Sequence, residues 1–327
     1  MSRVALAVAA AITLLPAVAS AQAPAASTAT QTIDVMNGLW GKHPGMRANH
    51  AKGVVVEGSF VANPVAATLS KATIFAGASV PITVRFSDAT GLPALPDGGS
   101  SANPHGMAIK FHPAQGATVD VVVNSLAVFP VATGEDFLAL LQAAGESGPD
   151  APKPTKLDKF VETHPAVAKA GASVSTPSSF AREVYNGVDA FIFVNAAGKR
   201  QPFRFQIVPV DGADHLTQEN AVETPDDFLV AELPQRLAKG PAAFHLLAQL
   251  ANPGDQTKDP TQAWPADRTL ADMGIITLTK AVADTDAASK QLRFLPTTLE
   301  PGIEPSDDPL IDARVRSYVI SFGRRAS

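Results

Sequence analysis

Four short segments in the first half of the chain alternate between apolar and polar residues. A period of two places every second side chain on the same face, as in a strand with one buried side. The pattern predicts strands at residues 53–61, 80–87, 106–112 and 118–124. Turns rich in glycine and proline separate these segments, so we expect the strands to pair with their neighbours in an antiparallel sheet or barrel.

The second half of the chain mixes strand and helix patterns. Further strands are predicted at 190–195, 202–209 and 275–281, whereas residues 240–250 fit neither period clearly. Helices are predicted at 135–145, 156–170, from 224 toward 237, and at 311–327, after a proline-rich connector at 296–309. Thr224 would be the N-cap of the third helix, with Pro225 at its first position. The mixture predicts a single α+β domain, an antiparallel β-barrel with surrounding helices.

The N-terminus has the pattern of a secretory signal peptide. Arg3 supplies a positive charge, residues 4–18 are apolar, and Ala19-Ser20-Ala21 or Ala21-Gln22-Ala23 supplies small residues for cleavage. The apolar run is shorter than the roughly 20 residues of a membrane span, and an uncleaved anchor stays open as the alternative. We expect export to the periplasm. The predicted segments are a signal peptide (1–21), a flexible leader with a short helix near 35–40 (22–42), and one haem-binding domain (43–327).

Composition narrows the possible functions. The chain has 327 residues, 46% hydrophobic and 17% charged, which suits a folded globular protein. Its net charge of −5 gives no indication of a nucleic-acid or anionic-membrane partner. There is no cysteine, so neither a disulfide nor thiol or iron–sulfur chemistry is available.

The terminal helix carries the first candidate for chemistry. It places Arg314 one turn before Tyr318, and Arg325, seven residues beyond Tyr318, on the same side. A guanidinium beside a phenol favours the phenolate and lowers the phenol pKa. A phenolate is one known axial ligand of haem iron, and the second arginine could bind a haem propionate. A basic surface helix without a ligand is the alternative for these residues alone.

Several short strings occur in an order that resembles the haem catalases. They are RANHAKG (47–53), VRFS (84–87), HGMAIKF (105–111), DVVVN (120–124), WP (264–265), PGIEPS (301–306) and the terminal Arg314–Tyr318–Arg325 set. Each string is unspecific alone, but the shared order over residues 43–325 is specific. The chain most resembles the short, exported catalase-related peroxidases, which implies a catalase-like barrel core and bound haem b.

The resemblance assigns the peroxide side of the haem to three residues. His50 matches the distal histidine, a general acid–base group that moves a proton between the two peroxide oxygens. Asn124 matches the distal asparagine, which donates a hydrogen bond to the peroxide. Ser87 matches the serine that orients the histidine through its other ring nitrogen. Asp88 and His105 are also polar and nearby, and they receive no role.

The same resemblance assigns the haem contacts. Tyr318 matches the axial iron ligand, and Arg314 matches the group that supports its phenolate. Phe137 matches an aromatic residue that lies against the haem face. The residues that match positions near the propionates are Arg47, Arg85 and Arg325.

Two departures from full catalases affect the expected activity. The chain stops at Ser327, where full catalases continue into a helical domain, so we expect a catalase-like core without that domain, as a monomer or small homo-oligomer. Asn49 precedes the distal histidine, where catalases usually have a small apolar residue. We therefore expect a haem peroxidase that reduces organic peroxides, with hydrogen peroxide as a further substrate. It would use an external small-molecule electron donor and pass through a ferryl intermediate.

Three alternatives stay open. The protein could be a true catalase, in which a second hydrogen peroxide is the reductant. It could isomerise a lipid hydroperoxide, or it could be a haem-binding carrier without turnover. The presence of both His50 and Asn124 argues against a carrier, which needs only the axial ligand and the propionate contacts.

Overall fold

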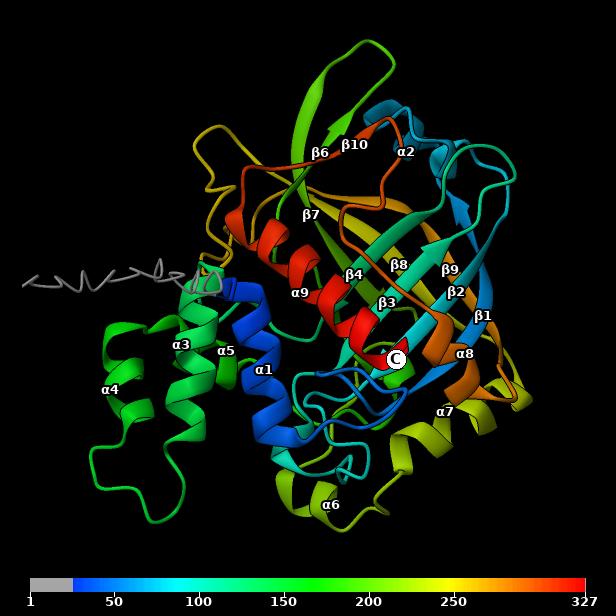
Figure 1. The fold of residues 1–327 in the computed structure, drawn as a ribbon. Helices are drawn as coiled ribbons and strands as arrows, with labels where there is room; N and C mark the ends of the chain where they lie inside the picture. The colour runs from blue at the N-terminus through cyan, green and yellow to red at the C-terminus, as the bar shows by residue number, and fades with distance from the viewer. Residues whose placement is uncertain (1–25, 327) are drawn as a thin grey trace, which may run out of the picture.

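Ten strands form one antiparallel sheet in residues 26–326, the part of the chain that the computed structural model describes (Figure 1). They are β1 (Gly53–Ala62), β2 (Val80–Ser87), β3 (Gly106–Phe111), β4 (Val119–Asn124), β5 (Tyr185–Asn186), β6 (Phe191–Val194), β7 (Arg200–Pro209), β8 (Ala242–Leu250), β9 (Leu270–Ala281) and β10 (Ile303–Pro305). Eight follow one another in the order β7-β5-β4-β3-β2-β1-β9-β8, and β8 pairs with β7 to close a barrel. β6 and β10 extend the sheet beyond β7. The predicted antiparallel barrel is confirmed.

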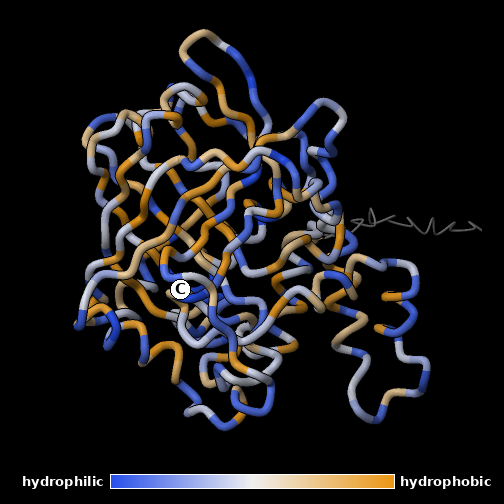
Figure 2. Tube along the Cα trace, turned by 180° about the vertical axis from the view of Figure 1, so that it is seen from behind, coloured by the Kyte–Doolittle hydropathy of each residue, from blue (hydrophilic) through white to orange (hydrophobic). Residues whose placement is uncertain are grey.

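The barrel interior is filled by the apolar residues of the alternating pattern. Phe60, Phe86, Phe111 and Phe244 are fully buried, and the rings of Phe60 and Phe111 meet edge to face at 5.3 Å between centroids. Figure 2 shows the hydrophobic residues gathered along the crossing strands. Burying one such side chain is worth roughly 1.5–3 kcal/mol, so the interior contributes much of the folding free energy.

The strands predicted in the first half of the chain are confirmed to within one residue at each end. Residues 240–250, which fit no period, form β8, in which Ala242, Phe244 and Leu246 alternate into the core. β9 begins at Leu270, ahead of the predicted strand. β10 lies in the proline-rich connector, where no strand is predicted, and pairs with β6 over three residues.

The helices cover the barrel from outside. They are α1 (Thr28–Trp40), α2 (Pro64–Leu69), α3 (Gly134–Gly145), α4 (Lys156–Thr163), α5 (Ala166–Ala172), α6 (Gln218–Val222), α7 (Phe228–Lys239), α8 (Thr285–Gln291) and α9 (Pro309–Ala326). α9, the terminal helix, lies across the barrel in front of β3 and β4, and α1 and α3 lie beside it (Figure 1). This arrangement sets three helices around one outer face of the barrel.

Two helix predictions are wrong in part. The helix expected at 156–170 is two helices, α4 and α5. Pro165 has no N–H for an intrahelical bond and disfavours a helical backbone at His164, which adopts φ −127°. Thr224 is not an N-cap, because its hydroxyl donates to the carbonyl of Ala221 at 2.7 Å and α7 begins at Phe228.

The leader expected to be flexible is helical from Thr28 onward. Ser27 Oγ accepts the N–H of Thr30 at 3.3 Å and caps α1. Ile33 and Met36 are buried among α3 and α9. This tertiary packing stabilises a helix that the alanine- and threonine-rich sequence would not hold alone.

The predicted signal peptide lies outside the described residues and stays a prediction, as does the division into segments built on it. Within residues 26–326, every helix is too short or too polar to cross a membrane.

Candidate active site

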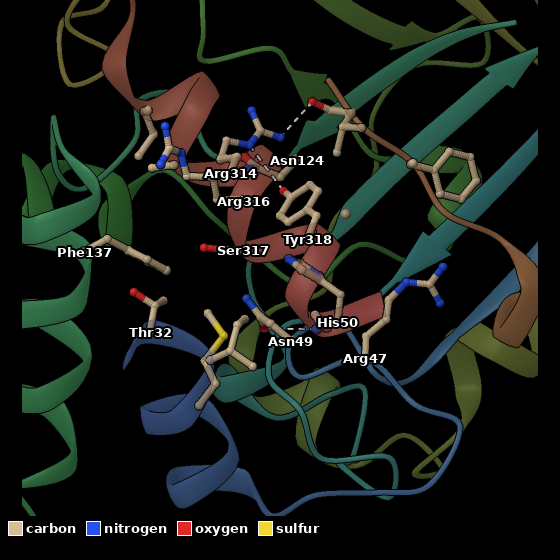
Figure 3. A pocket seen from close by; sticks show the side chains of 18 of the residues that line it. Thr32, Arg47, Asn49, His50, Asn124, Phe137, Arg314, Arg316, Ser317 and Tyr318 are labelled. Atoms are coloured by element: carbon tan, nitrogen blue, oxygen red, sulfur yellow. Dashed lines mark hydrogen bonds between the residues drawn. The ribbon is translucent and has the colours of Figure 1, made fainter. Parts of the chain in front are cut away.

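A cavity of about 750 Å³ lies between the barrel and the helices that cover it. The outer faces of β2, β3 and β4 form one wall, and α1, α3 and α9 form the others (Figure 3). This volume is in the usual range for a cofactor or ligand site. Nine residues that the sequence assigns to the haem or the peroxide all line the cavity: Arg47, His50, Arg85, Ser87, Asn124, Phe137, Arg314, Tyr318 and Arg325. The structure brings them together, and their roles stay predictions.

Strand alternation decides which residues of the barrel reach the cavity. The register aligns Ser87 of β2 with Gly106 of β3, and Gly106 with Asn124 of β4, in one row. A Cβ atom at Gly106 would lie 2.9 Å from Ser87 Oγ and 3.2 Å from His50 Nδ1. Glycine is therefore required in the middle of the row, and the imidazole of His50 rests against its backbone.

The contacts of His50 define its tautomer. Nδ1 lies 2.8 Å from the carbonyl oxygen of Asp88, which can only accept, so we assign the ring proton to Nδ1. Ser87 Oγ lies 3.2 Å from the same nitrogen and is a second, longer acceptor. The predicted serine contact is thus present, but the carbonyl of Asp88 is closer. Nε2 has no hydrogen-bond partner within the described residues and is left as a proton acceptor on the cavity.

The imidazole is neutral because of its surroundings. Burial, and next the positive charge of Arg85, lower the pKa of His50 from 6.5 to about 4. Its backbone adopts φ 58°, a left-handed conformation that typically costs 1–3 kcal/mol outside glycine. Asn49 Oδ1 accepts the N–H of His50 at 2.9 Å and supports this turn. Such strain is typical of a functional position.

Two further predicted residues border the same space. Asn124 Oδ1 accepts the N–H of Leu126 at 2.9 Å, so the Asn124 amide nitrogen remains available as a donor. Phe137 projects from α3 into the cavity (Figure 3), with its ring centroid 5.6 Å from that of Phe129. The cavity therefore has a polar side at the strand ends and an aromatic side at α3.

Arg47, Arg85 and Arg325 form a cluster that we call the arginine cluster. Ser289 Oγ accepts from Arg47 at 2.6 Å and from Arg85 at 2.9 Å. The carbonyl of Leu292 accepts from Arg47 at 2.9 Å and from Arg325. Arg325 Nε is buried without a partner. Across residues 26–326, no carboxylate forms an ion pair with any of the three.

The arginine cluster has excess positive charge. Burial lowers the pKa of Arg85 to about 9 and that of Arg325 to about 10, and repulsion from Arg325 also lowers that of Arg85. Burial, followed by repulsion from Arg85 and Arg325, lowers the pKa of Arg47. Guanidinium groups nevertheless stay protonated in proteins, so the cluster has a net positive charge that an anion would balance. The two propionates of haem fit this requirement.

The predicted iron ligand Tyr318 and its neighbour Arg314 lie on α9. Arg314 Nε donates to Tyr318 Oη at 3.2 Å, the contact that the spacing of four predicts. The same guanidinium forms an ion pair with Asp189 and donates to the carbonyl of Val122 at 3.3 Å. Asp189 is buried, so this ion pair fixes the position of the guanidinium. Figure 3 shows Arg314 facing the phenol of Tyr318. These residues fit a tyrosine that binds iron as a phenolate.

Sequence reasoning missed the residues that hold the predicted ones. Asp189 precedes an apolar strand, where a carboxylate indicates a buried ion pair. The sequence does not identify the arginine that forms it. Ser289 and Leu292 act through a hydroxyl and a backbone carbonyl in a segment with no predicted structure, so no pattern could identify them. The carbonyl of Asp88 is equally invisible in the sequence.

Comparison with known proteins identifies relatives that span most of the chain. The family model described as Catalase matches residues 19–325. A protein named catalase-related peroxidase from Synechococcus elongatus is 34% identical over 91% of this chain and 88% of its own length. One of the same name from Mycolicibacterium paratuberculosis is also 34% identical, over 91% and 95%. A solved bacterial catalase aligns with a TM-score of 0.78 at 22% identity, over 87% of this chain and 58% of its own.

Proposed function

The chain belongs to the catalase family, and from this we propose that it is a haem-dependent peroxidase. It reduces organic peroxides, and also hydrogen peroxide, with electrons from an external small-molecule donor. The relatives of similar length carry the name catalase-related peroxidase, which supports an oxidoreductase that acts on peroxide. Overall, the peroxide becomes an alcohol and water as the donor gives up two electrons, with two protons consumed.

The neutral imidazole of His50 is the observation that carries the proposal. Its Nδ1–H is engaged by the carbonyl of Asp88, so Nε2 faces the cavity as a base. A neutral histidine can take the proton from one peroxide oxygen and return it to the leaving oxygen. The amide nitrogen of Asn124 would donate a hydrogen bond to the same peroxide, because the amide oxygen already accepts the N–H of Leu126.

The cofactor would be haem b, held by groups on both sides of the cavity. Tyr318 would bind the iron, and the Arg314 guanidinium would stabilise the phenolate. The arginine cluster would bind the propionates through charge-assisted hydrogen bonds. When bound, the haem iron supplies the electrons that cleave the peroxide O–O bond.

The helical walls favour an organic peroxide. Ala29, Ile33 and Met36 of α1 line the cavity on one face of that helix, and Phe129 lines it near α3. These side chains offer apolar surface to the alkyl or aryl group of an organic peroxide. Hydrogen peroxide has no apolar group that could be buried against them. We propose further that the enzyme acts in the periplasm after signal cleavage, as a monomer or small homo-oligomer, without a nucleic-acid partner.

Rapid mixing of purified haem-loaded protein with peroxide tests the function. His50→Ala should keep haem, because the ligand and propionate contacts lie elsewhere, and should react about 10²–10⁴-fold more slowly. The matched control is His112→Ala, which removes an imidazole that contacts Thr83 outside the cavity.

Steady-state assays distinguish the reduction of an organic peroxide from catalase turnover of hydrogen peroxide. Donor oxidation with a bulky organic peroxide supports the peroxidase, whereas oxygen release from hydrogen peroxide without a donor identifies catalase turnover. A His50→Ala protein that reacts at the wild-type rate would show that the chain binds haem without using this residue in catalysis.

A further inference from the structure

Four buried ionisable residues lie directly behind His50 and have no part in the chemistry so far. They are Lys52, Asp88, Asp97 and His105, and each is at most 8% exposed. We call them the support cluster. Its link to the active site is Asp88, whose backbone carbonyl accepts the Nδ1–H of His50 at 2.8 Å. The position of that carbonyl decides how the imidazole is aimed.

One oxygen of the Asp88 side chain is bound by a neutral histidine. His105 Nδ1 lies 3.1 Å from Asp88 Oδ1, and both side chains are fully buried. Burial lowers the pKa of His105 to about 4, so its ring is neutral and donates its single proton to the carboxyl group. The backbone N–H of Asp88 is bound as well, at 3.2 Å from the carbonyl of Lys52.

The other side of Asp88 meets Asp97. Lys52 links the two residues, because its backbone carbonyl accepts the N–H of Asp88 and its Nζ pairs with Asp97 Oδ1. Asp88 Oδ2 is buried and has no hydrogen-bond partner of its own within the described residues, and two carboxyl oxygens attract only when a proton lies between them. Burial raises the pKa of Asp88 to about 6 and that of Asp97 to about 7. The pair therefore shares a proton at pH values below about 7.

Asp97 is itself fixed at two points. Lys52 Nζ pairs with Asp97 Oδ1 at 2.5 Å, and the N–H groups of Leu229 and Val230, in the first turn of α7, donate to Asp97 Oδ2 at 2.7 and 3.4 Å. A helix N-terminus and an ammonium group thus hold Asp97 rigidly against Asp88.

We propose that Asp88, clamped between His105 and Asp97, is the positioning residue that keeps His50 aimed at the peroxide. The inference rests on the proposed function, because it concerns the base of that reaction. The charged groups that face the pair are Lys52, Arg85 and Asp227. Loss of the shared proton in alkali places two carboxylates side by side, and their repulsion displaces Asp88 and with it the His50 contact.

Two substitutions at Asp88 separate positioning from simple packing. Asp88→Ala removes the clamp, so the full-length haem-loaded protein should react with hydrogen peroxide about 10- to 100-fold more slowly, the usual effect of losing a group that orients a functional side chain. Asp88→Asn can still accept from His105 and donate to Asp97. It should keep the wild-type rate at pH 6 and lack the fall in rate that we expect of wild type as the pH rises through about 7.

An equally buried carboxylate elsewhere provides the control. Glu300 is 4% exposed and bonds Thr73 and Ile74 away from the cavity. Glu300→Gln should leave both the rate and its pH profile unchanged. Infrared spectra give a readout independent of activity, since wild type should show a buried carboxylic acid band at neutral pH that Asp88→Asn loses.

The outcomes distinguish this inference from the proposed function. If Asp88→Ala reacts as fast as wild type while His50→Ala is slow, the inference fails and the function stands. If His50→Ala is itself fast, the function fails. If Asp88→Ala does not fold, the pH profile of Asp88→Asn decides. The inference is overturned if the rate of Asp88→Asn falls in alkali in the same way as the wild-type rate.

Discussion

The pH dependence of the reaction with peroxide follows from the surroundings of His50. The proposed base must be neutral, and burial together with Arg85 lowers its pKa to about 4. At pH 5, a histidine with pKa 4 is about 90% neutral, whereas one with the ordinary pKa of 6.5 is about 3% neutral. The structure therefore predicts a rate at pH 5 about 30-fold higher than that of an enzyme with an ordinary histidine.

Because the pKa of His50 is lowered, the rate of reaction with peroxide should persist to a lower pH than it would with an ordinary histidine. The rate should stay level as the pH falls from 6 to 5, and should drop only as the pH approaches the value of about 4. The second-order rate constant from stopped-flow haem absorbance, measured at constant ionic strength, gives the profile directly. Haem content is checked at each pH, so that loss of cofactor is not taken for titration of His50. A half-maximal rate near pH 6.5 would refute the reasoning, because it would mean that the imidazole is solvated as in water.

Other predictions concern the rest of the site and the N-terminus. Tyr318→Phe should lose the iron ligand, seen as low haem content or a shifted haem spectrum, and an unchanged spectrum would exclude the assignment. Asp189→Asn removes the charge partner of Arg314 and should shift the spectrum in the same direction by less, in a haem titration of both variants. Gly106→Ala should keep haem but slow the reaction with peroxide, because the added methyl group displaces the distal imidazole. Mass spectrometry of periplasmic protein should find a chain that begins near Gln22, and an intact first residue there would contradict the signal peptide.

The fold could be predicted where the structure depends on local pattern. Period-two alternation located the strands because each barrel strand buries one face. In β2 the structure places Phe86 in the barrel and Arg85 and Ser87 on the side of the cavity. Alternation carries no information on register. The row that joins Ser87, Gly106 and Asn124 across three strands therefore became visible only in the structure.

Two of the wrong predictions, at α1 and at the start of α7, have a cause in long-range contacts. α1 is helical because α3 and α9 bury one of its faces, which no property of residues 24–32 indicates. The first turn of α7 is capped by Asp97, more than a hundred residues away, so the local candidate Thr224 is unused. In the site, the side chains that face the cavity were predicted through the family resemblance. The groups that hold them from behind were not, because they contribute a carbonyl or a hydroxyl at a position set by the barrel.

The arginine cluster also has a consequence for how the chain matures. Three guanidiniums that share one hydroxyl and one carbonyl repel one another until an anion joins them, so the folded state carries a penalty that the extended chain does not. The proposed haem, a dianion, would remove that penalty and would bind only the folded form, so it would stabilise the fold as well as take part in the reaction. The melting temperature of the cofactor-free protein should therefore rise with added haem. It should rise to a smaller extent with added phosphate, and replacing Arg325 with a neutral residue should reduce both shifts.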